Sequence, residues 1–592
     1  MRRKLSAIAV VLIFTLLLTT MAGVNTKTFA AETTDSSEYN QYEMPIVTIN
    51  TDSDSKIDSN EVYTNAKISL INDEGKYEMS DIATSVKLRG NSSMNSEKKS
   101  YKIKFGEKQN LLNIGDGKGK TWCLISNCFD GSLLRNLTVY HFAEFLDGIS
   151  YSPNCRSIEL YVNHEYQGVY LLCEDVNINK NRVAISEEPN EVENNGYLVE
   201  MSRYAKDNKF DIDTATYEVK SDLSETQSIK NQQINYISKS IEKAYNALKS
   251  GNENEVSKYM DIDSFVDIYI GNEIVKNVDA GWDSFYMYKD AGGKLFFGPM
   301  WDFDLAMGNA NCVKGFESWK GFNPYNVLNV NANSNPWFCH ALSKSWFRDL
   351  VKKRWNKLQG KINGIPKTVI KEAQTNYKSY CRNFDRWDVL GKQVYIEPTE
   401  ISSLTTFRQH YNYLSSWLNN RTKWLTKYIN SKDFKNGVFV NYNGKQLTSN
   451  SNLLEISPLL ALLNTPDVDL TYKMLPNIGL TLSIKNGGAE SWNTQVDASG
   501  FMIEKGAEYV LSFDYSCSEP RQMPICIQQN YAPWSPYYSG ELKATKEPQH
   551  YETVIKAPAS DSNCAFIISL GGDTFNGTDV TIDNMSLVKK SK

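Results

Sequence analysis

Asp279 and Asp302 are the residues whose type and spacing most clearly suggest chemistry. They lie at the outer ends of two segments rich in alternating aromatic residues, which flank a turn at Ala291-Gly292. Such a pattern predicts a β-hairpin. Paired residue numbers across this turn sum to about 583, so Asp302 is expected opposite Gly281, two residues from Asp279. Two carboxylates at the open end of a hairpin, beside the end of a helix, suit one metal ligand and one general base. The alternative is that each aspartate only caps a helix or a turn.

A second group of residues has the chemistry to bind phosphate. The segment Leu88–Ser93 is a strand end followed by a small polar turn, and Lys98–Phe105 is a second strand that carries several lysines. Backbone N–H groups of the turn and the ammonium groups of Lys99 or Lys102 could contact nucleotide phosphates. The alternative is a simple hairpin with solvated lysines on its polar face.

These residues must be positioned by a β-rich first part and a helical second part. Before residue 202 the sequence predicts short β-strands and one helix over Leu133–Leu146. After residue 202 the apolar residues recur with helical periodicity, and Asp263 is expected to be the N-cap of one helix. The expected strands are 83–88, 101–105, 121–126, 157–162, 168–173 and 196–201, and the expected helices are 224–250, 264–277, 344–361, 366–382 and 402–430. Residues after about Lys435 are rich in Ser, Asn, Thr and Gly and alternate like the strands of a β-sandwich. The strands expected there are 480–484, 509–515, 523–529, 551–555, 565–570 and 580–587.

Composition and charge exclude several classes of protein. The chain has 592 residues, 41% of them hydrophobic and 12% aromatic, which excludes wholesale disorder, collagen and coiled coil. A formal charge of −5 provides no basic excess for a nucleic-acid backbone. The ten cysteines include no C-x-x-C pair, and there are only five histidines, which argues against a zinc ribbon or a zinc hydrolase.

The first residues indicate secretion. Basic residues at Met1–Lys4, an uncharged run over Leu5–Gly23 and small residues near Ala30-Ala31 predict a cleaved signal peptide over 1–31. An uncleaved membrane anchor is the alternative. Residues 32–43 are expected to be a polar tether. The mature chain would be more acidic than the whole chain, which does not suit an anionic membrane surface. We therefore expect a secreted or extracellular protein, associated with a cell surface or spore coat, with no membrane or nucleic-acid partner.

Five motifs in order resemble the CotH family of spore-coat-type protein kinases. They are R-G-N-S with K-K-x-Y-K-I-K-F (89–105), D-x-S-L-L-R-N (130–136), I-E-L-Y-V-N-x-E-Y-x-G-V-Y-L-L-C-E (158–174), G-Y-L-V-E (196–200) and N-x-D with W-D-F-D (277–304). The resemblance implies an α+β atypical protein-kinase-like catalytic domain over 44–434. It also implies transfer of a phosphoryl group from ATP, with Mg²⁺ or Mn²⁺, to Ser or Thr of secreted or spore-coat proteins.

The resemblance also implies roles for individual residues. Asp279 would be the catalytic carboxylate and Asp302 the metal ligand, and Asp304 would complete the metal site, although many relatives have Asn there. The other residues with implied roles are Lys99 or Lys102 on phosphate, Arg89, Asn91 and Ser92 in the turn, Arg135 and Asn136 near the cofactor, and Glu174 as the partner of the lysine. The sequence departs from the family at Trp282-Asp283-Ser284, where many members carry Asn; Asp283 is a possible replacement for that contact, and this departure places activity in question.

Residues 435–592 resemble a carbohydrate-binding module of the family 4/9 type, an all-β sandwich (jelly roll). The resemblance is carried by G-x-x-Y-x-L-S-F (506–513) and I-D-N-x-S-L (582–587). Sugar rings bind exposed aromatic rings beside amides. The candidates for polysaccharide contact are Trp492, Gln528, Trp534, Tyr537 and Tyr538. These aromatics could instead belong to a core or a protein-contact surface.

Three functions remain open from the sequence. The first is a secreted CotH-like kinase that its last module targets to polysaccharide. The second is a non-catalytic polysaccharide-binding surface or spore protein on an inactive kinase fold. The third is a carbohydrate-active enzyme that uses Asp279, Asp302 and Asp304 as acid, base or metal groups.

Overall fold

The fold was analysed in a computed structural model. It describes residues 44–71, 77–115, 117–213, 215–281, 283–310, 335–437, 452–456, 460–463, 468–475, 479–530 and 533–590. The predicted signal peptide and tether lie outside the described residues, as does Trp282. Within these ranges, no helix combines the length and the apolar character needed to cross a membrane.

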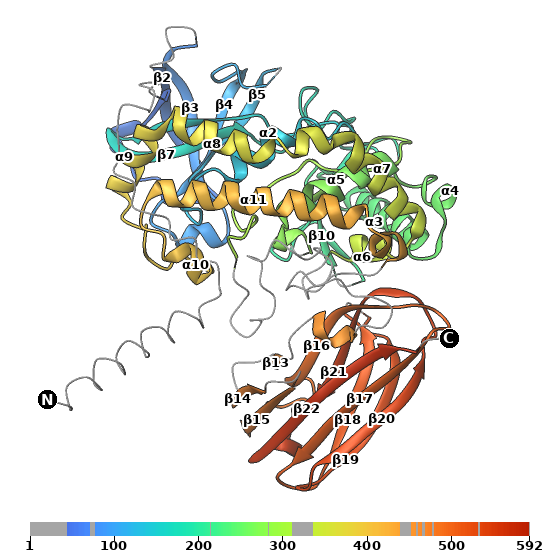
Figure 1. Cartoon of the computed structure of the whole chain (residues 1–592). Coiled ribbons are helices and arrows are strands. Elements are labelled where there is room, and N and C mark those ends of the chain that lie inside the picture. The colour runs from blue at the N-terminus through green and yellow to red at the C-terminus, as the bar shows by residue number, and fades with distance from the viewer. Residues whose placement is uncertain are drawn as a thin grey trace, which may run out of the picture. The chain divides into compact units, whose positions relative to one another are not determined.

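The first part of the chain is a closed β-barrel (Figure 1). Its strand order is β1-β2-β3-β4-β5-β7-β6, and closure comes from parallel pairing of β1 with β6. The strands are β1 (Ile46–Thr51), β2 (Thr64–Ile71), β3 (Met79–Arg89), β4 (Ser100–Gln109), β5 (Gly119–Ile125), β6 (Cys155–Val162) and β7 (Glu165–Glu174). The predicted strands agree with β3 to β7, whereas β1, β2 and the closure were not predicted.

Alternation of side chains explains the barrel interior. Val47, Ile103, Trp122, Tyr170 and Leu172 point inward and are buried in one apolar cluster. Successive residues of a strand face opposite sides of the sheet, so their immediate neighbours face outward. The lysines of β4 at positions 102 and 104 alternate with its buried residues in this way. The barrel therefore carries its charged side chains on the outside.

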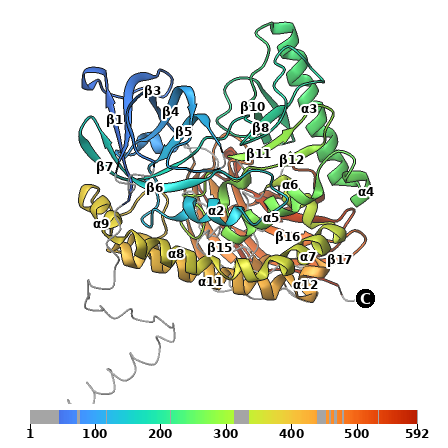
Figure 2. The same cartoon turned by 90° about the horizontal axis from the view of Figure 1, so that it is seen from above.

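A second, antiparallel sheet and a set of helices follow the barrel. The sheet order is β12-β11-β8-β10-β9. Its strands are β8 (Tyr197–Met201), β9 (Lys209–Ile212), β10 (Ala215–Val219), β11 (Phe285–Lys289) and β12 (Leu295–Phe297). Figure 2 shows this sheet beside the barrel, with α7, α8 and α11 running along one side. The helices are α2 (Arg135–Ala143), α3 (Gln227–Ser250), α4 (Glu253–Val256), α5 (Ile262–Val275), α6 (Pro336–Leu342), α7 (Ser345–Ile362), α8 (Ile365–Thr375), α9 (Tyr377–Arg386), α10 (Thr399–Ser402), α11 (Phe407–Ile429) and α12 (Lys432–Asn436).

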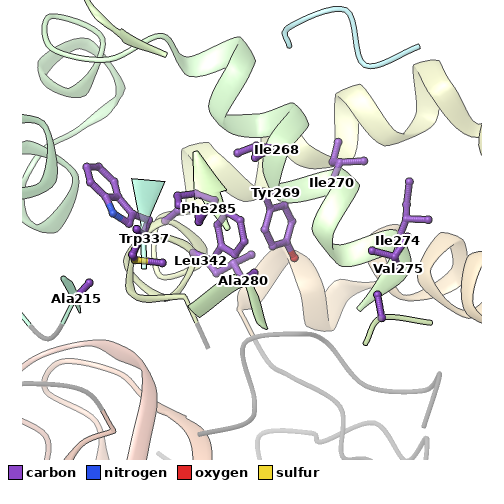
Figure 3. Packing of buried hydrophobic residues seen from close by; sticks show 14 of the residues in the cluster. Ala215, Ile268, Tyr269, Ile270, Ile274, Val275, Ala280, Phe285, Trp337 and Leu342 are labelled. Carbon is purple, nitrogen blue, oxygen red and sulfur yellow. The ribbon is translucent and has the colours of Figure 1, made fainter. Parts of the chain in front are cut away.

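Helix α5 is the central helix of this second region. Its residues Ile268 to Val275 are buried, and Figure 3 shows Tyr269 and Phe285 among the packed side chains around it. Trp337 packs edge-on against Phe265 and donates a hydrogen bond to the Tyr217 hydroxyl at 3.0 Å. Burial of aromatic side chains of this size contributes about 1.5–3 kcal/mol each. The end of α5, from which Asp279 follows, is therefore firmly held.

Two local predictions about the helices were wrong. The N-cap of α5 is Asp261, whose side chain accepts from Ser264 N, whereas Asp263 already lies inside the helix. The predicted helix 366–382 is two helices, because α8 ends at Thr375 and Asn376 leaves the helical conformation. The other predicted helices agree with the structure to within a few residues.

The described residues after 452 form two five-stranded sheets. The sheet orders are β13-β16-β21-β18-β19 and β14-β15-β22-β17-β20. The strands are β13 (Leu460–Leu463), β14 (Asp469–Leu475), β15 (Gly479–Asn486), β16 (Thr494–Ile503), β17 (Glu508–Cys517), β18 (Arg521–Gln529), β19 (Pro536–Ala544), β20 (Gln549–Lys556), β21 (Asp561–Ser569) and β22 (Thr578–Lys589). Phe513 of one sheet contacts Phe566 of the other, with ring centroids 5.6 Å apart. The two sheets thus share apolar side chains, as in a sandwich.

Candidate functional site

A cavity of about 360 Å³ is lined by both the barrel and the second region. Its volume falls within the range of about 300–1,000 Å³ that is usual for small-molecule sites. Most of the residues that the sequence singled out line it. They are Arg89, Asn91, Ser92, Lys102, Asp279, Asp283, Asp302 and Asp304. Lys99, Arg135, Asn136 and Glu174 do not line it.

The turn between β3 and β4 forms one edge of the cavity. Gly90 has a φ of +108°, and a Cβ atom there would lie 2.0 Å from Ser93 Oγ, so glycine is required. Lys99 Nζ donates to Met94 O at 2.6 Å, which holds the turn rather than a ligand. Ser92 Oγ lies 3.4 Å from Tyr204 Oη of the second region. The turn and the loop after β8 therefore meet across the cavity.

Lys102 is the lysine of β4 that faces the cavity. Its Nζ forms an ion pair with Asp175 Oδ2 at 2.7 Å. Although burial favours the neutral acid, the charge and hydrogen bond of Lys102 hold the pKa of Asp175 below its ordinary value. Cys123 Sγ also donates to this carboxylate at 3.3 Å. The barrel wall thus presents an ammonium group that is positioned by a buried carboxylate.

The predicted pairing of Glu174 with this lysine was wrong. Glu174 Oε2 accepts from Asn154 N and Nδ2, both at 3.0 Å, and Arg182 Nε lies 3.7 Å from Oε1. Burial raises the pKa of Glu174 despite these partners. Its role is to hold the segment around Asn154 to the barrel, and the neighbouring Asp175 pairs with Lys102 instead.

Asp279 reaches the cavity because the chain turns sharply after α5. Lys276 adopts the left-handed conformation at φ +48°, and Asp279 then lies in a short 3-10 turn over Val278–Gly281. Asp279 N donates to Asn277 Oδ1 at 3.1 Å, and Asn277 Nδ2 donates to Asn272 Oδ1 at 3.0 Å. The predicted position beside a helix end is confirmed.

Asp302 lies in a loop beyond the hairpin rather than on a strand. Pairs such as Met287 with Phe297 sum to 584, one more than predicted, but β12 ends at Phe297. Asp302 has a φ of +64°, which is costly for a residue with a side chain. The next backbone N–H, that of Phe303, donates to Asn136 Oδ1 at 2.7 Å. Asn136 thereby holds the unusual conformation from the side of α2.

Arg135 supports the same loop and is not placed to bind a cofactor directly. It is buried, forms an ion pair with Asp130, and donates from Nε to Ala306 O at 3.0 Å. Asn309 Nδ2 donates to Asp304 O at 2.7 Å from the other side. The loop that carries Asp302 and Asp304 is thus fixed by buried polar side chains.

Burial and nearby carboxylates raise the pKa values of all three aspartates. Burial and the charge of Asp302 raise the pKa of Asp279 to about 7, against the opposing effect of Arg203. Burial, Asp302 and Asp279 raise the pKa of Asp304 far above its ordinary range. The pKa of Asp302 is raised by burial in spite of Arg89. Because Arg203 and Arg89 do not offset these effects, a bound cation would supply further positive charge.

The donor set fits Mg²⁺ together with a nucleotide. Among the residues that the structure describes, no three His, Cys, Asp or Glu side chains converge to hold a metal on their own. Mg²⁺ is usually bound by one or two carboxylates, with waters and substrate phosphates as its other ligands. Asp302 and Asp304 line the cavity and would be the residues that provide those carboxylates.

Several cavity residues were not predicted from the sequence. Besides Asp175, they include Glu200 with Lys220, whose charged groups lie 3.3 Å apart. Asp283 forms an ion pair with Arg203 at 2.7 Å and accepts from Ser202 Oγ, so it is already engaged. Glu200 lies on β8 and Lys220 directly follows β10, which pairs with β8. Opposite charges at these two positions were the available signal, but recognising it requires the register of the two strands.

The candidates for polysaccharide contact lie on one sheet of the last region. Gln528 is on β18, Trp534 is in the turn to β19, and Tyr537 and Tyr538 begin β19. Tyr537 Oη donates to Asp561 Oδ2 at 2.6 Å, and Tyr538 Oη contacts Tyr551 Oη. Trp492 precedes β16, two strands away in the same sheet. Trp492 and Trp534 are 56% and 50% exposed.

A family model described as CotH kinase protein matches residues 86–425, which is more than half of the chain. No curated protein matches the chain. A solved structure described as "CBM4 structure and function" is 17% identical, with 22% of this chain and 86% of that chain covered and a TM-score of 0.20. The N-terminal cellulose-binding domain of Cellulomonas fimi β-1,4-glucanase C is 20% identical, with 23% and 90% covered and a TM-score of 0.19.

Proposed function

Because the chain belongs to the CotH kinase family, we propose that it transfers the γ-phosphoryl group of ATP to Ser or Thr side chains of a secreted or spore-coat protein. The observation that carries the proposal is one cavity with Lys102 and Arg89 on one wall and three aspartates of raised pKa on the other. Phosphoryl transfer needs these two kinds of group on either side of the phosphates.

The barrel wall would bind and orient the phosphates. Lys102 donates from a fixed position, because its ion pair with Asp175 limits where the ammonium group can lie. Arg89 lies over the Trp301 ring at 5.4 Å, where its guanidinium can reach toward the same space. Backbone N–H groups of the Gly90–Ser93 turn add neutral donors. Of the two lysines suggested by the sequence, we assign the role to Lys102.

Asp302 and Asp304 would hold Mg²⁺. When bound, the ion neutralises charge on the β- and γ-phosphates. The buried contacts of Asn136 and Arg135 keep the loop of Asp302 and Asp304 in place before the nucleotide arrives. Such preorganisation is the main source of rate in phosphoryl transfer.

Asp279 would act on the acceptor hydroxyl. A new bond forms between the hydroxyl oxygen and the γ-phosphorus, the bond from phosphorus to the β–γ bridging oxygen breaks, and the hydroxyl proton passes to Asp279. A pKa near 7 means that a large share of Asp279 is ionised at neutral pH and that it still binds a proton readily.

The last region would bind polysaccharide and direct the kinase to it. Trp534 and Trp492 are the large apolar side chains most exposed among the candidates, and a sugar ring can stack on such a face. Gln528 lies on the strand next to Tyr537 and Tyr538 and can supply an amide contact. Cleavage of residues 1–31 as a signal peptide would release the protein to the extracellular space.

The test is transfer of radiolabelled γ-phosphate, with Mg²⁺ or Mn²⁺, to the protein itself and to a secreted-protein extract. Wild type is compared with Asp279→Ala, Asp302→Ala and the exposed control Asp147→Ala. Label that is lost in the first two variants and retained in the control supports both roles. Absence of label in wild type, with polysaccharide binding intact, would favour a binding protein on an inactive kinase fold.

A further inference from the structure

A second cavity of about 230 Å³ adjoins the first one. It is lined by residues before β4, by the segment 127–133, and by residues of α9, of α11 and of the connection between these two helices. Asn127 and Cys128 line both cavities. No role in the proposed kinase reaction has been assigned to this second cavity.

The wall of the second cavity is apolar. Phe384, Trp387, Val389, Leu390 and Val394 line it, and all five are partly exposed. A cavity of about 150 Å³ lined by apolar residues can bind benzene. The larger volume here has room for one ring and a short polar arm.

Of the carboxyl groups that line the second cavity, Glu97 is exposed, and one other is buried without an ion pair among the described residues. Asp130 is paired with Arg135, and Lys98 Nζ donates to Val169 O and Asn383 Oδ1 at 2.6 and 2.8 Å. Burial lowers the pKa of His410 to about 4, so this side chain is neutral.

Glu397 is that carboxyl, and it is only 5% exposed. Within the described part of the chain, no lysine, arginine or histidine forms an ion pair with it. Its carboxyl accepts from the backbone of Val394, and burial raises its pKa to about 7 against the opposing charge of Arg135, which is itself paired with Asp130. A buried carboxylate gains stability from a cation that donates hydrogen bonds to it.

We propose that this second cavity binds a small organic ammonium ion, whose apolar body packs against the Phe384 and Trp387 wall and whose N–H groups donate to Glu397. Aromatic walls favour a cation over an anion, since the ring faces are electron-rich. Lys98 Nζ donates to Val169 O and Asn383 Oδ1 and forms no ion pair with Glu397 among the described residues.

The second cavity is joined to the loop of the metal ligands by hydrogen bonds. Asn127 Oδ1 accepts from Asn136 Nδ2 at 2.9 Å, and Asn136 Oδ1 in turn accepts from Phe303 N, between Asp302 and Asp304. A ligand that shifts Asn127 therefore acts on the conformation of that loop. This coupling rests on the proposed function, whereas binding of the ammonium ion does not.

Binding is tested by titration calorimetry of the full chain without nucleotide. The probes are benzylammonium, benzyl alcohol and benzoate, which share a ring and differ in charge. Benzylammonium is expected to bind at least about 10-fold more tightly than the other two, and Glu397→Gln should remove that preference. Equal binding of benzoate, or unchanged binding by Glu397→Gln, would overturn the proposal.

A second variant guards against misfolding of Glu397→Gln. Leu390→Trp fills the cavity from its wall and leaves the carboxyl in place, and it should also abolish benzylammonium binding. Coupling is then measured as the factor by which benzylammonium changes the affinity for Mg-ATP. Mg-ATP should change the affinity for benzylammonium by the same factor. If benzylammonium leaves the Mg-ATP affinity unchanged, the coupling is overturned but the ammonium site is not. Failure of wild type to bind Mg-ATP overturns the coupling and the proposed function but not the ammonium site.

Discussion

The two walls of the first cavity hold buried carboxylates in opposite electrostatic states. On the barrel wall, Lys102 keeps the pKa of Asp175 low in spite of burial. On the opposite wall, burial and Asp302 raise the pKa of Asp279 to about 7. The barrel wall balances its own charge, whereas on the other wall Arg203 and Arg89 do not offset the effects that raise the pKa values of Asp279 and Asp302. Groups of the second kind are the ones expected to do chemistry.

The largest expected effect is the loss of catalysis when Asp302, on the wall opposite the barrel, loses its charge. Asp302→Asn should lower the rate of phosphoryl transfer by at least about 100-fold, because the proposed ligand of Mg²⁺ is lost. Its free energy of unfolding without divalent cations should stay equal or rise, since repulsion among the aspartates falls. Transfer assays and thermal melting in EDTA measure the two effects. A variant that loses activity only because it unfolds would contradict this interpretation.

Exchange of aspartate for asparagine should change stability in opposite directions on the two walls. Asp175→Asn should lower the free energy of unfolding by about 1–3 kcal/mol, because Lys102 loses its buried partner. Asp279→Asn should raise it by on the order of 1 kcal/mol near pH 7. Urea unfolding without metal compares the two variants directly. The same sign of change for both would show that the walls do not differ as proposed.

The sequence predicted the strands of the barrel better than their pairing. Alternation identified β3 to β7, but closure depends on Ile46 pairing in parallel with Glu159, far away in the chain. Local periodicity contains no information on such a contact. The hairpin register was predicted within one residue because a short turn fixes it.

The candidate site shows the same limit. Lys102 on β4 pairs with Cys123 on the neighbouring strand β5, and Cys123 pairs with Cys173 on β7. These three side chains therefore lie on one face of the sheet. Glu174 must then point to the other face, and Asp175 returns to that of Lys102. Which acidic residue pairs with Lys102 is therefore decided by the face of the sheet on which each side chain lies. The bracing of Asp302 by Asn136 depends on tertiary contacts that no spacing reveals.

The pH dependence of stability should also distinguish the two walls. The folded pKa of Asp279, about 7, lies above its unfolded value of about 3.9, so the folded state binds the proton more tightly. Without divalent cations, stability should fall as pH rises from about 4 to 7, by at most about 1.4 kcal/mol per pH unit for this group. Asp175 has a lowered pKa and contributes stability that is lost only below about pH 4.

Melting temperatures of wild type and Asp279→Asn in EDTA test this expectation. Burial also raises the pKa of Asp267 to about 6 and that of Glu397 to about 7, so wild type alone shows a composite slope. The difference between wild type and the variant reports the titration of Asp279 together with its effect on the pKa of Asp304. Parallel curves over pH 4 to 7 would show that Asp279 titrates normally.

The smallest expected effect concerns the neighbouring acids Glu174 and Asp175. Glu174→Gln should leave the affinity for Mg-ATP within about twofold of wild type, because the glutamine oxygen can still accept from Asn154 and Lys102 keeps its own partner. Asp175→Asn should weaken that affinity by about 10-fold, since the ammonium group of Lys102 is no longer held in place. Equilibrium binding of labelled ATP to both variants decides between them. A loss for Glu174→Gln equal to that for Asp175→Asn would mean that the barrel wall acts as one rigid unit, rather than through the single ion pair to which we attribute its balance of charge.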